Sequence, residues 1–218
     1  MGREFLPLFN EWANSYDDTI SGSDKEYRTV FERYDEILEE VANKAEGNVL
    51  EFGVGTGNLS KKIMEKGQEL IGIEPSVVMR KIVKEKYPSI QVFDGDFLEF
   101  PTIRETVDSI VSTYAFHHLT DLEKEDAIRK YASLLPSHGK IIFADTVFET
   151  EKAKEDMIED AMKKEYHRLA NDLKSEYYTT IEVLHQIFNR NHFDVTFEKM
   201  NDFVWLFIAT KHDQVRGK

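Results

Sequence analysis

The chain contains no cysteine among its 218 residues. This absence excludes disulfide scaffolds, thiolate metal sites and cysteine nucleophiles, and it fits a reducing compartment. Proline and glycine are also scarce, at 5 and 11 residues, while 41% of the residues are hydrophobic. Such a composition indicates a globular protein rather than a disordered or fibrous one. A domain of this length buries roughly 70% of the surface that its unfolded chain exposes.

Positive charge and long apolar runs are scarce as well. The 28 basic residues stand against 41 acidic ones, and the net charge of −13 disfavours phosphate backbones and anionic lipid surfaces as partners. The uncharged run at 203–210 is too short to cross a bilayer, and residues 1–14 lack the apolar centre of a signal peptide. We expect a cytoplasmic protein, monomeric or homodimeric, that binds neither nucleic acid nor membrane.

Short apolar runs alternate with helical patterns along most of the chain. The runs lie at 48–52, 69–73, 90–93, 107–112 and 140–147. Strands that alternate with helices form right-handed βαβ units, which give a parallel sheet covered on both faces. Two neighbouring runs, 193–199 and 203–210, predict a closing antiparallel hairpin. The predicted fold class is therefore α/β, with a seven-stranded, mostly parallel sheet.

Helix signals divide the rest of this single domain, 1–218. Apolar residues at helical spacing predict a helix from Asp24 to Gly47, within an N-terminal helical cap that spans 1–46. Thr120 with Glu123 and Thr179 with Glu182 fit the capping-box pattern that begins a helix. The charged segment 149–178 predicts a helical insertion that could act as a lid.

The strongest local motif is a glycine-rich loop between the first strand and the helix after it. Gly53, Gly55 and Gly57 allow a tight turn and a close approach of a ligand to the backbone. Glu74, at the end of the second strand, is placed to accept hydrogen bonds from both hydroxyls of a ribose. The pattern departs from the dinucleotide fingerprint, because Asn58 stands where the third glycine belongs. Glu51 would repel a pyrophosphate but suits a positively charged ligand.

These residues resemble the ordered motifs of class I S-adenosylmethionine-dependent methyltransferases, which have a Rossmann-like fold. The resemblance lies in Val49-Leu-Glu-Phe-Gly-Val-Gly-Thr-Gly-Asn-Leu59, Gly72-Ile-Glu-Pro-Ser76, Asp94-Gly-Asp-Phe97 and Ala115-Phe-His-His-Leu119. Further segments are similar to the YrrT-type methyltransferases of bacteria: Gly2-Arg-Glu-Phe, Trp12, Tyr16-Asp17, Phe143-Ala-Asp-Thr-Val-Phe148 and Asn201-Asp-Phe-Val-Trp205. The resemblance covers nearly the whole chain and implies S-adenosylmethionine as the cofactor.

The resemblance assigns most of the cofactor contacts to the first three strand ends. It implies that Gly53 and Gly55 pack against the methionine part of the cofactor and that Glu51 lies near its ammonium group. It also implies that Glu74 holds the ribose. The adenine would then be bound by four residues, of which two flank the base and two contact its polar edge: Pro75, Met79, Asp96 and Phe97.

The resemblance further implies that Tyr114 and Ala115 border the sulfonium and that Tyr16 closes over the cofactor. A pocket formed by Tyr16, Tyr27, Tyr114, His118 and the insertion would suit a compact, partly polar methyl acceptor. Similar proteins are thought to work near sulfur amino-acid recycling, which is family context rather than a property of these residues. The predicted function is methyl transfer to a small molecule.

Several alternatives stay open beside this interpretation. Asp94 and Asp96 could bind a metal, but a hard cation usually needs more oxygen ligands, so no metal is expected. His118 is the candidate for proton transfer, while His117 fits structural packing at a turn better. The protein could instead be a nicotinamide-dependent oxidoreductase, or a non-catalytic module that binds S-adenosylmethionine or S-adenosylhomocysteine.

Overall fold

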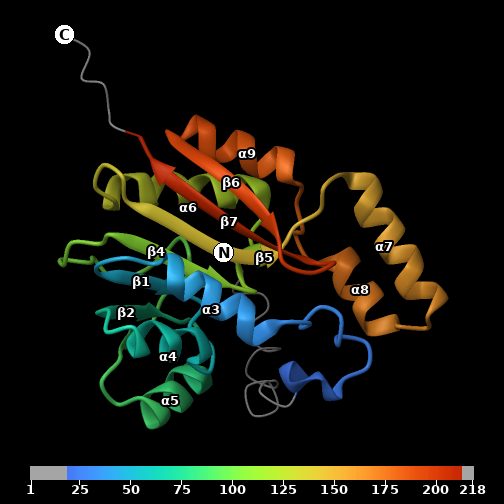
Figure 1. Ribbon diagram of the computed structural model, residues 1–218, viewed down its shortest axis with the longest axis horizontal. Coiled ribbons are helices and arrows are strands. Elements are labelled where there is room, and N and C mark those ends of the chain that lie inside the picture. The colour runs from blue at the N-terminus through green and yellow to red at the C-terminus, as the bar shows by residue number, and fades with distance from the viewer. Residues whose placement is uncertain (1–18, 213–218) are drawn as a thin grey trace.

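The computed structural model describes residues 19–212, which form a sheet flanked by helices (Figure 1). The sheet has seven strands in the order β3-β2-β1-β4-β5-β7-β6. The strands are β1 Val49–Phe52, β2 Leu70–Ile73, β3 Gln91–Phe93, β4 Ser109–Thr113, β5 Lys140–Thr146, β6 Phe193–Lys199 and β7 Val204–Lys211. The first five pair in parallel, whereas β7 pairs antiparallel with both β5 and β6. The predicted fold class and the closing hairpin are confirmed.

Helices cover both faces of this sheet. The helical elements in the described range are η2 Thr19–Ser23, α3 Tyr34–Lys44, α4 Asn58–Glu65, α5 Val77–Lys86, η3 Phe116–His118, α6 Asp121–Leu134, α7 Glu151–Lys163, α8 His167–Ser175 and α9 Ile181–Arg190. One core cluster joins α3 and α4 to one face of the sheet, and another joins α6 and α9 to the opposite face. None of the helices within 19–212 is both long enough and apolar enough to span a membrane.

The alternation of side chains along β1 decides which face receives the acidic residue beside the glycine loop. Val49 belongs to the cluster under α3 and α4, while Leu50 and Phe52 belong to the cluster on the other face. Successive residues of a strand point to opposite faces. Glu51 therefore points toward α4, where its carboxylate accepts a hydrogen bond from Ser60 Oγ at 2.5 Å.

The predicted start of the helix at Asp24 is wrong by ten residues. Residues 25–33 form turns, and the helix α3 begins at Tyr34 after Arg33, whose φ of 61° interrupts any helix. The apolar spacing is real, because Tyr27 and Phe31 pack into the same cluster as α3. However, some backbone carbonyls of this segment accept hydrogen bonds from other parts of the chain instead of continuing a helix. Asn201 Nδ2, for example, donates to the carbonyls of Val30 and Glu32.

Two further details of the predicted helices need correction. The helical insertion expected at 149–178 contains two helices, α7 and α8, which are separated by a short link that includes Glu165 with φ 61°. Helix α9 begins with Thr180 as its N-cap, which accepts from the amide of Val183. The capping box expected for Thr179 with Glu182 is therefore wrong: the cap lies one residue later, where the third helical residue is Val183 and has no side-chain acceptor. The capping box of Thr120 with Glu123 is confirmed at the start of α6.

The strand β3 differs from the buried strand that its sequence predicts. It lies at one edge of the sheet, and of its three residues only Val92 is buried. An edge strand needs one buried face only, so the short apolar run could not distinguish the two situations. The remaining strands lie within two residues of their predicted limits.

Candidate active site

Three buried carboxylates follow or end the first three strands at one edge of the sheet. Glu51 lies in β1, Glu74 directly follows β2, and Asp96 lies in the loop after β3; all three are at most 6% exposed. We call this region, with the loop 53–57, the cofactor edge. It adjoins the point between β1 and β4 where the strand order reverses, which is where open α/β sheets bind ligands.

The glycine loop could not be built from other residues. Gly53, Gly55 and Gly57 have φ values of 69°, 57° and 87°, in the region that side chains disfavour. A Cβ on Gly57 would lie 2.4 Å from Val83 Cγ2, and one on Gly53 would lie 2.9 Å from Ala115 Cβ. A Cβ on Gly55 would meet nothing closer than 4.0 Å. The space beside Gly55 is therefore open, whereas other side chains fill the space beside Gly53 and Gly57.

Glu74 binds the glycine loop through its side chain. Its Oε2 accepts from the amide of Gly55 at 2.8 Å, and its Oε1 accepts from the amide of Ser76 at 2.8 Å. Burial raises the pKa of Glu74, although these two amides favour the charged form. Each carboxylate oxygen has two lone pairs, so one on each oxygen remains for a further donor.

Glu51 lies in a more isolated position than Glu74. Burial raises its pKa to about 8, the hydrogen bond from Ser60 opposes the shift, and the charge of Glu74 adds to it. A carboxylate with this pKa lacks a cation among its surroundings. A positively charged ligand group beside Glu51 would therefore stabilise its carboxylate form.

The loop after β3 is closed by Asp96. Its Oδ1 accepts from the amides of Leu98 and Glu99 at 2.9 and 2.8 Å. The Phe97 ring is buried in a stack with Phe52, at a centroid distance of 5.4 Å. Asp96 and Phe97 are thus fixed by local contacts beside the ends of β1 and β2.

Asp94 is engaged by a residue that the sequence interpretation missed. Arg80 Nη1 donates to Asp94 Oδ1 at 2.8 Å and also to the carbonyls of Glu74 and Pro75, at 2.6 and 2.8 Å. The guanidinium therefore holds the backbone after Glu74, in the segment that the resemblance places beside the adenine. The sequence signal for this contact was a basic residue one turn into α5.

The strand β4 ends with an unusual backbone conformation. Tyr114 has a φ of 53°, and its ring packs on Phe31 and Tyr34 with centroid distances of 5.3 and 5.4 Å. The next residue, Ala115, faces Gly53. The structure therefore brings Tyr114 and Ala115 to the cofactor edge. Tyr16 lies outside the described residues.

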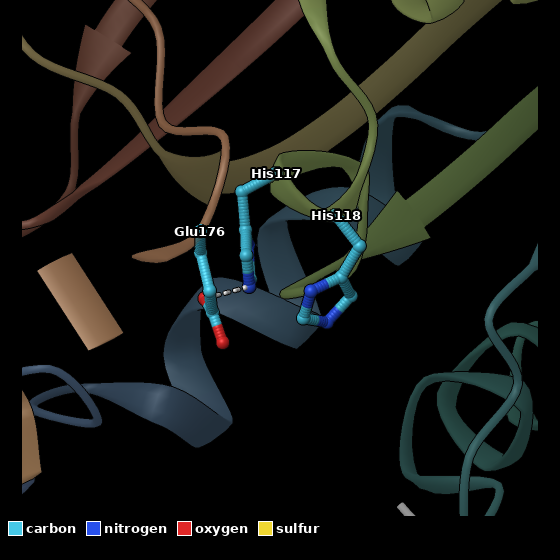
Figure 2. A group of neighbouring side chains, drawn as sticks. All are labelled: His117, His118 and Glu176. Carbon is cyan, nitrogen blue, oxygen red and sulfur yellow. Dashed lines mark ion pairs between the residues drawn. The ribbon is translucent and has the colours of Figure 1, made fainter. Parts of the chain in front are cut away.

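A second polar region lies beyond β4, and Figure 2 shows its centre. His117 Nδ1 contacts Asp145 Oδ1 at 2.5 Å, and His117 Nε2 contacts Glu176 Oε2 at 3.1 Å. Burial opposes the charged imidazole, but the two carboxylates raise the pKa of His117 to about 10. The charge of His117 and its contact with Glu176 in turn hold the pKa of Glu176 down to about 2 despite its burial.

The neighbouring ring of His118 behaves in the opposite way. Burial and the charge on His117 lower the pKa of His118 to about 3, so its imidazole is neutral at neutral pH. The two imidazole centroids are 4.1 Å apart. Tyr178 stacks on His117 at 4.9 Å and donates its hydroxyl to Glu176 Oε2 at 2.7 Å. His117 is thus more than packing, which was the role favoured from sequence.

The insertion is joined to the N-terminal segment next to this cluster. The Tyr27 hydroxyl donates to Asp172 Oδ2. Glu26 Oε2 accepts from the amides of Arg168 and Leu169, at 2.9 and 3.2 Å, at the beginning of α8. We call the cluster around His117, the insertion 149–178 and the segment 24–33 together the acceptor side.

Sequence reasoning placed Tyr27, His118 and the insertion near the acceptor but missed the carboxylates of the acceptor side. Asp145 and Glu176 were not singled out, because neither belongs to a local motif with chemical meaning. Asp145 occupies the carboxyl end of β5, and the ends of parallel strands meet at one edge; that position was the only signal. Within the insertion, Tyr178 joins the cluster, while His167 is exposed.

Comparison with known proteins agrees with this geometry. Residues 49–139 match a family model described as a methyltransferase domain. An uncharacterized methyltransferase of Oceanobacillus iheyensis is 51% identical, over 97% of this chain and 99% of its own. Another from Bacillus cytotoxicus is 54% identical, over 97% and 100%. The chain therefore belongs to this family of bacterial methyltransferases.

Solved structures show the same fold at low sequence identity. A magnesium protoporphyrin IX methyltransferase from Synechocystis PCC 6803, solved with bound SAH, superposes with a TM-score of 0.71 at 15% identity, over 97% of this chain and 100% of that one. A Thermotoga maritima SAM-dependent methyltransferase, described as a possible histamine N-methyltransferase, gives 0.66 at 18% identity, over 95% and 99%. The resemblance to class I methyltransferases is confirmed.

Proposed function

We propose that the protein transfers a methyl group from S-adenosylmethionine to a small-molecule acceptor. The observation that carries this proposal is the geometry of Glu74. Its buried carboxylate is fixed by the amides of Gly55 and Ser76, one on each oxygen. The lone pairs that remain suit the two adjacent hydroxyls of a ribose.

The rest of the cofactor edge fits the other parts of the cofactor. The open space beside Gly55 admits the methionine portion, and the buried Glu51 complements its ammonium group. Asp96 would accept from the adenine amino group, because local amides fix its carboxylate in the loop that follows β3. Phe97 would donate its backbone amide to the base. Pro75 would lie against the ring.

The chemistry at the acceptor side consists mainly of orientation. When bound, the cofactor supplies an electrophilic methyl group on a sulfonium. Tyr114 and Ala115 would border that sulfonium, and alignment of two bound reactants can lower a barrier by roughly 7 to 11 kcal/mol. His118 is neutral and can accept a hydrogen bond from the acceptor. With a pKa of about 3 it is a weak base, so positioning suits it better than proton abstraction.

The segment 24–33 and the insertion 149–178 form a cover on the acceptor side, which favours a small acceptor over a macromolecule. Arg168 pairs with Asp24 and Glu26 at 2.9 and 3.2 Å, and Tyr27 binds Asp172, so the segment 24–33 and the insertion hold each other in place. We further propose that this pair acts as a lid. Thiols of sulfur amino-acid metabolism are the first acceptors to test, since the family resemblance points there.

Calorimetric titration of the full chain with S-adenosylmethionine, and separately with NAD⁺, tests the cofactor. We expect binding of S-adenosylmethionine alone, because Glu51 would oppose a pyrophosphate. Binding of NAD⁺ alone would favour an oxidoreductase and overturn the proposal. Transfer of a labelled methyl group into a small-molecule extract then separates an enzyme from a module that only binds the cofactor. A protein that binds but transfers nothing would contradict the enzymatic part.

A further inference from the structure

Three side chains of the acceptor side place metal-ligating atoms together. One ligand atom each from His117, His118 and Glu176 lies within 4.8 Å of the other two (Figure 2). The histidines come from η3 and the glutamate from the segment after α8, so the fold brings them together from positions about 60 residues apart. Two imidazoles and one carboxylate form a donor set that proteins use for zinc and for other divalent transition metals.

The spacing of these atoms is close to that of a coordinated ion. His117 Nε2 and Glu176 Oε2 are 3.1 Å apart. Ligands at 2.0–2.2 Å from a tetrahedral zinc ion are separated by about 3.3 Å, so this pair is already near its place. A nitrogen of His118 would have to move inward by roughly 1.5 Å at most, which is within the reach of a side-chain rotation.

The residues behind the three ligands are arranged as supports of a metal site. Asp145 Oδ1 contacts His117 Nδ1 at 2.5 Å, which leaves Nε2 as the nitrogen that faces Glu176. Asp145 is itself fixed by the amides of His117 and Thr146, at 3.0 and 2.7 Å. A carboxylate behind a ligating histidine fixes the ring and raises its basicity in many metal sites. Tyr178 holds Glu176 in position, because its hydroxyl donates to Oε2.

The surrounding charge also favours a cation. Besides Asp145 and Glu176, a third carboxylate belongs to these surroundings: Asp172, which interacts electrostatically with Glu176. The buried ammonium of Lys124 points to the carbonyls of Leu119 and Tyr177 and interacts with Asp145, while Arg168 interacts with Asp172. An ion pair between His117 and its two carboxylates would need no second imidazole. The presence of His118 at the same point is explained by ligation.

We propose that His117, His118 and Glu176 bind a divalent transition-metal ion of the zinc type. The ion takes the place of the proton on His117 Nε2 and leaves a fourth coordination position open, as in zinc sites that hold a substrate or water. This differs from the Asp94 and Asp96 pair considered from sequence, which Arg80 and local amides engage. The proposal goes beyond methyl transfer, because cation binding requires neither cofactor nor acceptor.

The test is zinc binding to the tag-free full chain after treatment with a chelator, followed by calorimetry and elemental analysis. We expect one zinc ion per chain. Asp145→Asn should weaken binding by roughly 10- to 100-fold, since it removes only the support of His117. His118→Ala and Glu176→Gln should weaken it further. The control is His185→Ala, which removes an exposed histidine on α9 and should leave the affinity unchanged.

Cobalt substitution of the unaltered protein provides a readout that does not depend on how well the variants fold. A four-coordinate site of nitrogen and oxygen ligands predicts intense visible absorption from bound Co²⁺. The proposal is overturned if the wild-type chain retains no zinc, or if Co²⁺ shows only the weak bands of the hydrated ion. It is equally overturned if folded His118→Ala and Glu176→Gln bind zinc as tightly as His185→Ala does.

Discussion

The cofactor edge and the acceptor side lie next to each other but are held together differently. At the cofactor edge, buried carboxylates accept from groups near in sequence: Gly55 and Glu74 are 19 residues apart, and Asp96 and Leu98 only 2. On the acceptor side, His117 and Asp145 are 28 residues apart, and Tyr27 and Asp172 are 145 apart. The cofactor edge should therefore keep its shape when the acceptor side is loosened.

The sharpest way to break this comparison is to disturb the packing of the glycine loop. Gly57→Ala places a Cβ 2.4 Å from Val83 and forces alanine into a φ of 87°. Left-handed strain of about 1–2 kcal/mol and overpacking of about 1–3 kcal/mol should together lower the free energy of unfolding by roughly 2–5 kcal/mol. Urea denaturation measures the loss.

Gly67→Ala is the matched control for that substitution. Gly67 has a φ of 77°, but a Cβ there would meet nothing within 4 Å. Only the strain of about 1–2 kcal/mol should remain. Equal losses in the two variants would show that close packing of the loop against α5 contributes nothing.

The contact between Tyr27 and Asp172 tests whether the acceptor side can be loosened separately. Tyr27→Phe removes the hydroxyl that binds the carboxylate, and hydrogen bonds to charged groups contribute about 1.5–3 kcal/mol. We expect a loss of that size in unfolding free energy, with the affinity for S-adenosylmethionine unchanged. A parallel loss of cofactor affinity would mean that the two regions are not separable.

Glu51 should make cofactor binding dependent on pH. Its folded pKa of about 8 lies above the usual 4.5, so the protonated carboxyl stabilises the free protein fully below about pH 4.5 and loses this effect as the pH rises through 8. The ammonium of the cofactor favours the carboxylate, so binding at pH 6.5 should release up to one proton. Affinity should rise by at most tenfold per pH unit between about 5 and 8.

Proton release is measured by calorimetry in buffers of different ionisation enthalpy. The enthalpy of binding should vary with the buffer for the wild type and not for Glu51→Gln. At pH 6.5 an amino group that titrates at about 7.7–8.0 stays protonated, so the cofactor contributes little to the effect. A buffer-independent enthalpy in the wild type would remove Glu51 from the cofactor contacts.

The smallest effect concerns the capping box that begins α6, two residues after His118. Thr120→Ala removes the acceptor for the Glu123 amide and should cost about 1 kcal/mol of unfolding free energy. Because the cap lies outside the cofactor edge, cofactor affinity should stay the same. Thermal unfolding, followed by titration with S-adenosylmethionine, checks both expectations.

The two regions also differ in how far the sequence predicts them. Glu51, Glu74 and Asp96 lie at the ends of consecutive strands or just after them. Glu74 and Asp96 bind backbone amides, which every sequence supplies, and Glu51 binds the hydroxyl of Ser60 only nine residues away. Asp145 and Glu176 become site residues only because the fold brings them into contact with His117, and no sequence spacing predicts those contacts. The same reason explains the misplaced start of α3. Periodicity shows that Tyr27 and Phe31 pack toward the core. It does not show that the Arg168 amide binds the carboxylate of Glu26 or that Asn201 binds the carbonyl of Val30.

The most direct test is the affinity for S-adenosylmethionine of two matched charge-neutral variants, Glu74→Gln and Glu176→Gln, measured by calorimetry beside the wild type. Loss of one hydrogen bond to a charged group at the cofactor edge, worth about 1.5–3 kcal/mol, predicts an affinity roughly 10- to 150-fold weaker in Glu74→Gln. Glu176→Gln should stay within about twofold of the wild type, because the carboxylate of Glu176 contacts His117 and Tyr178 of the acceptor side. Equal weakening in both variants, or none in Glu74→Gln, would contradict a cofactor edge that binds independently of the acceptor side.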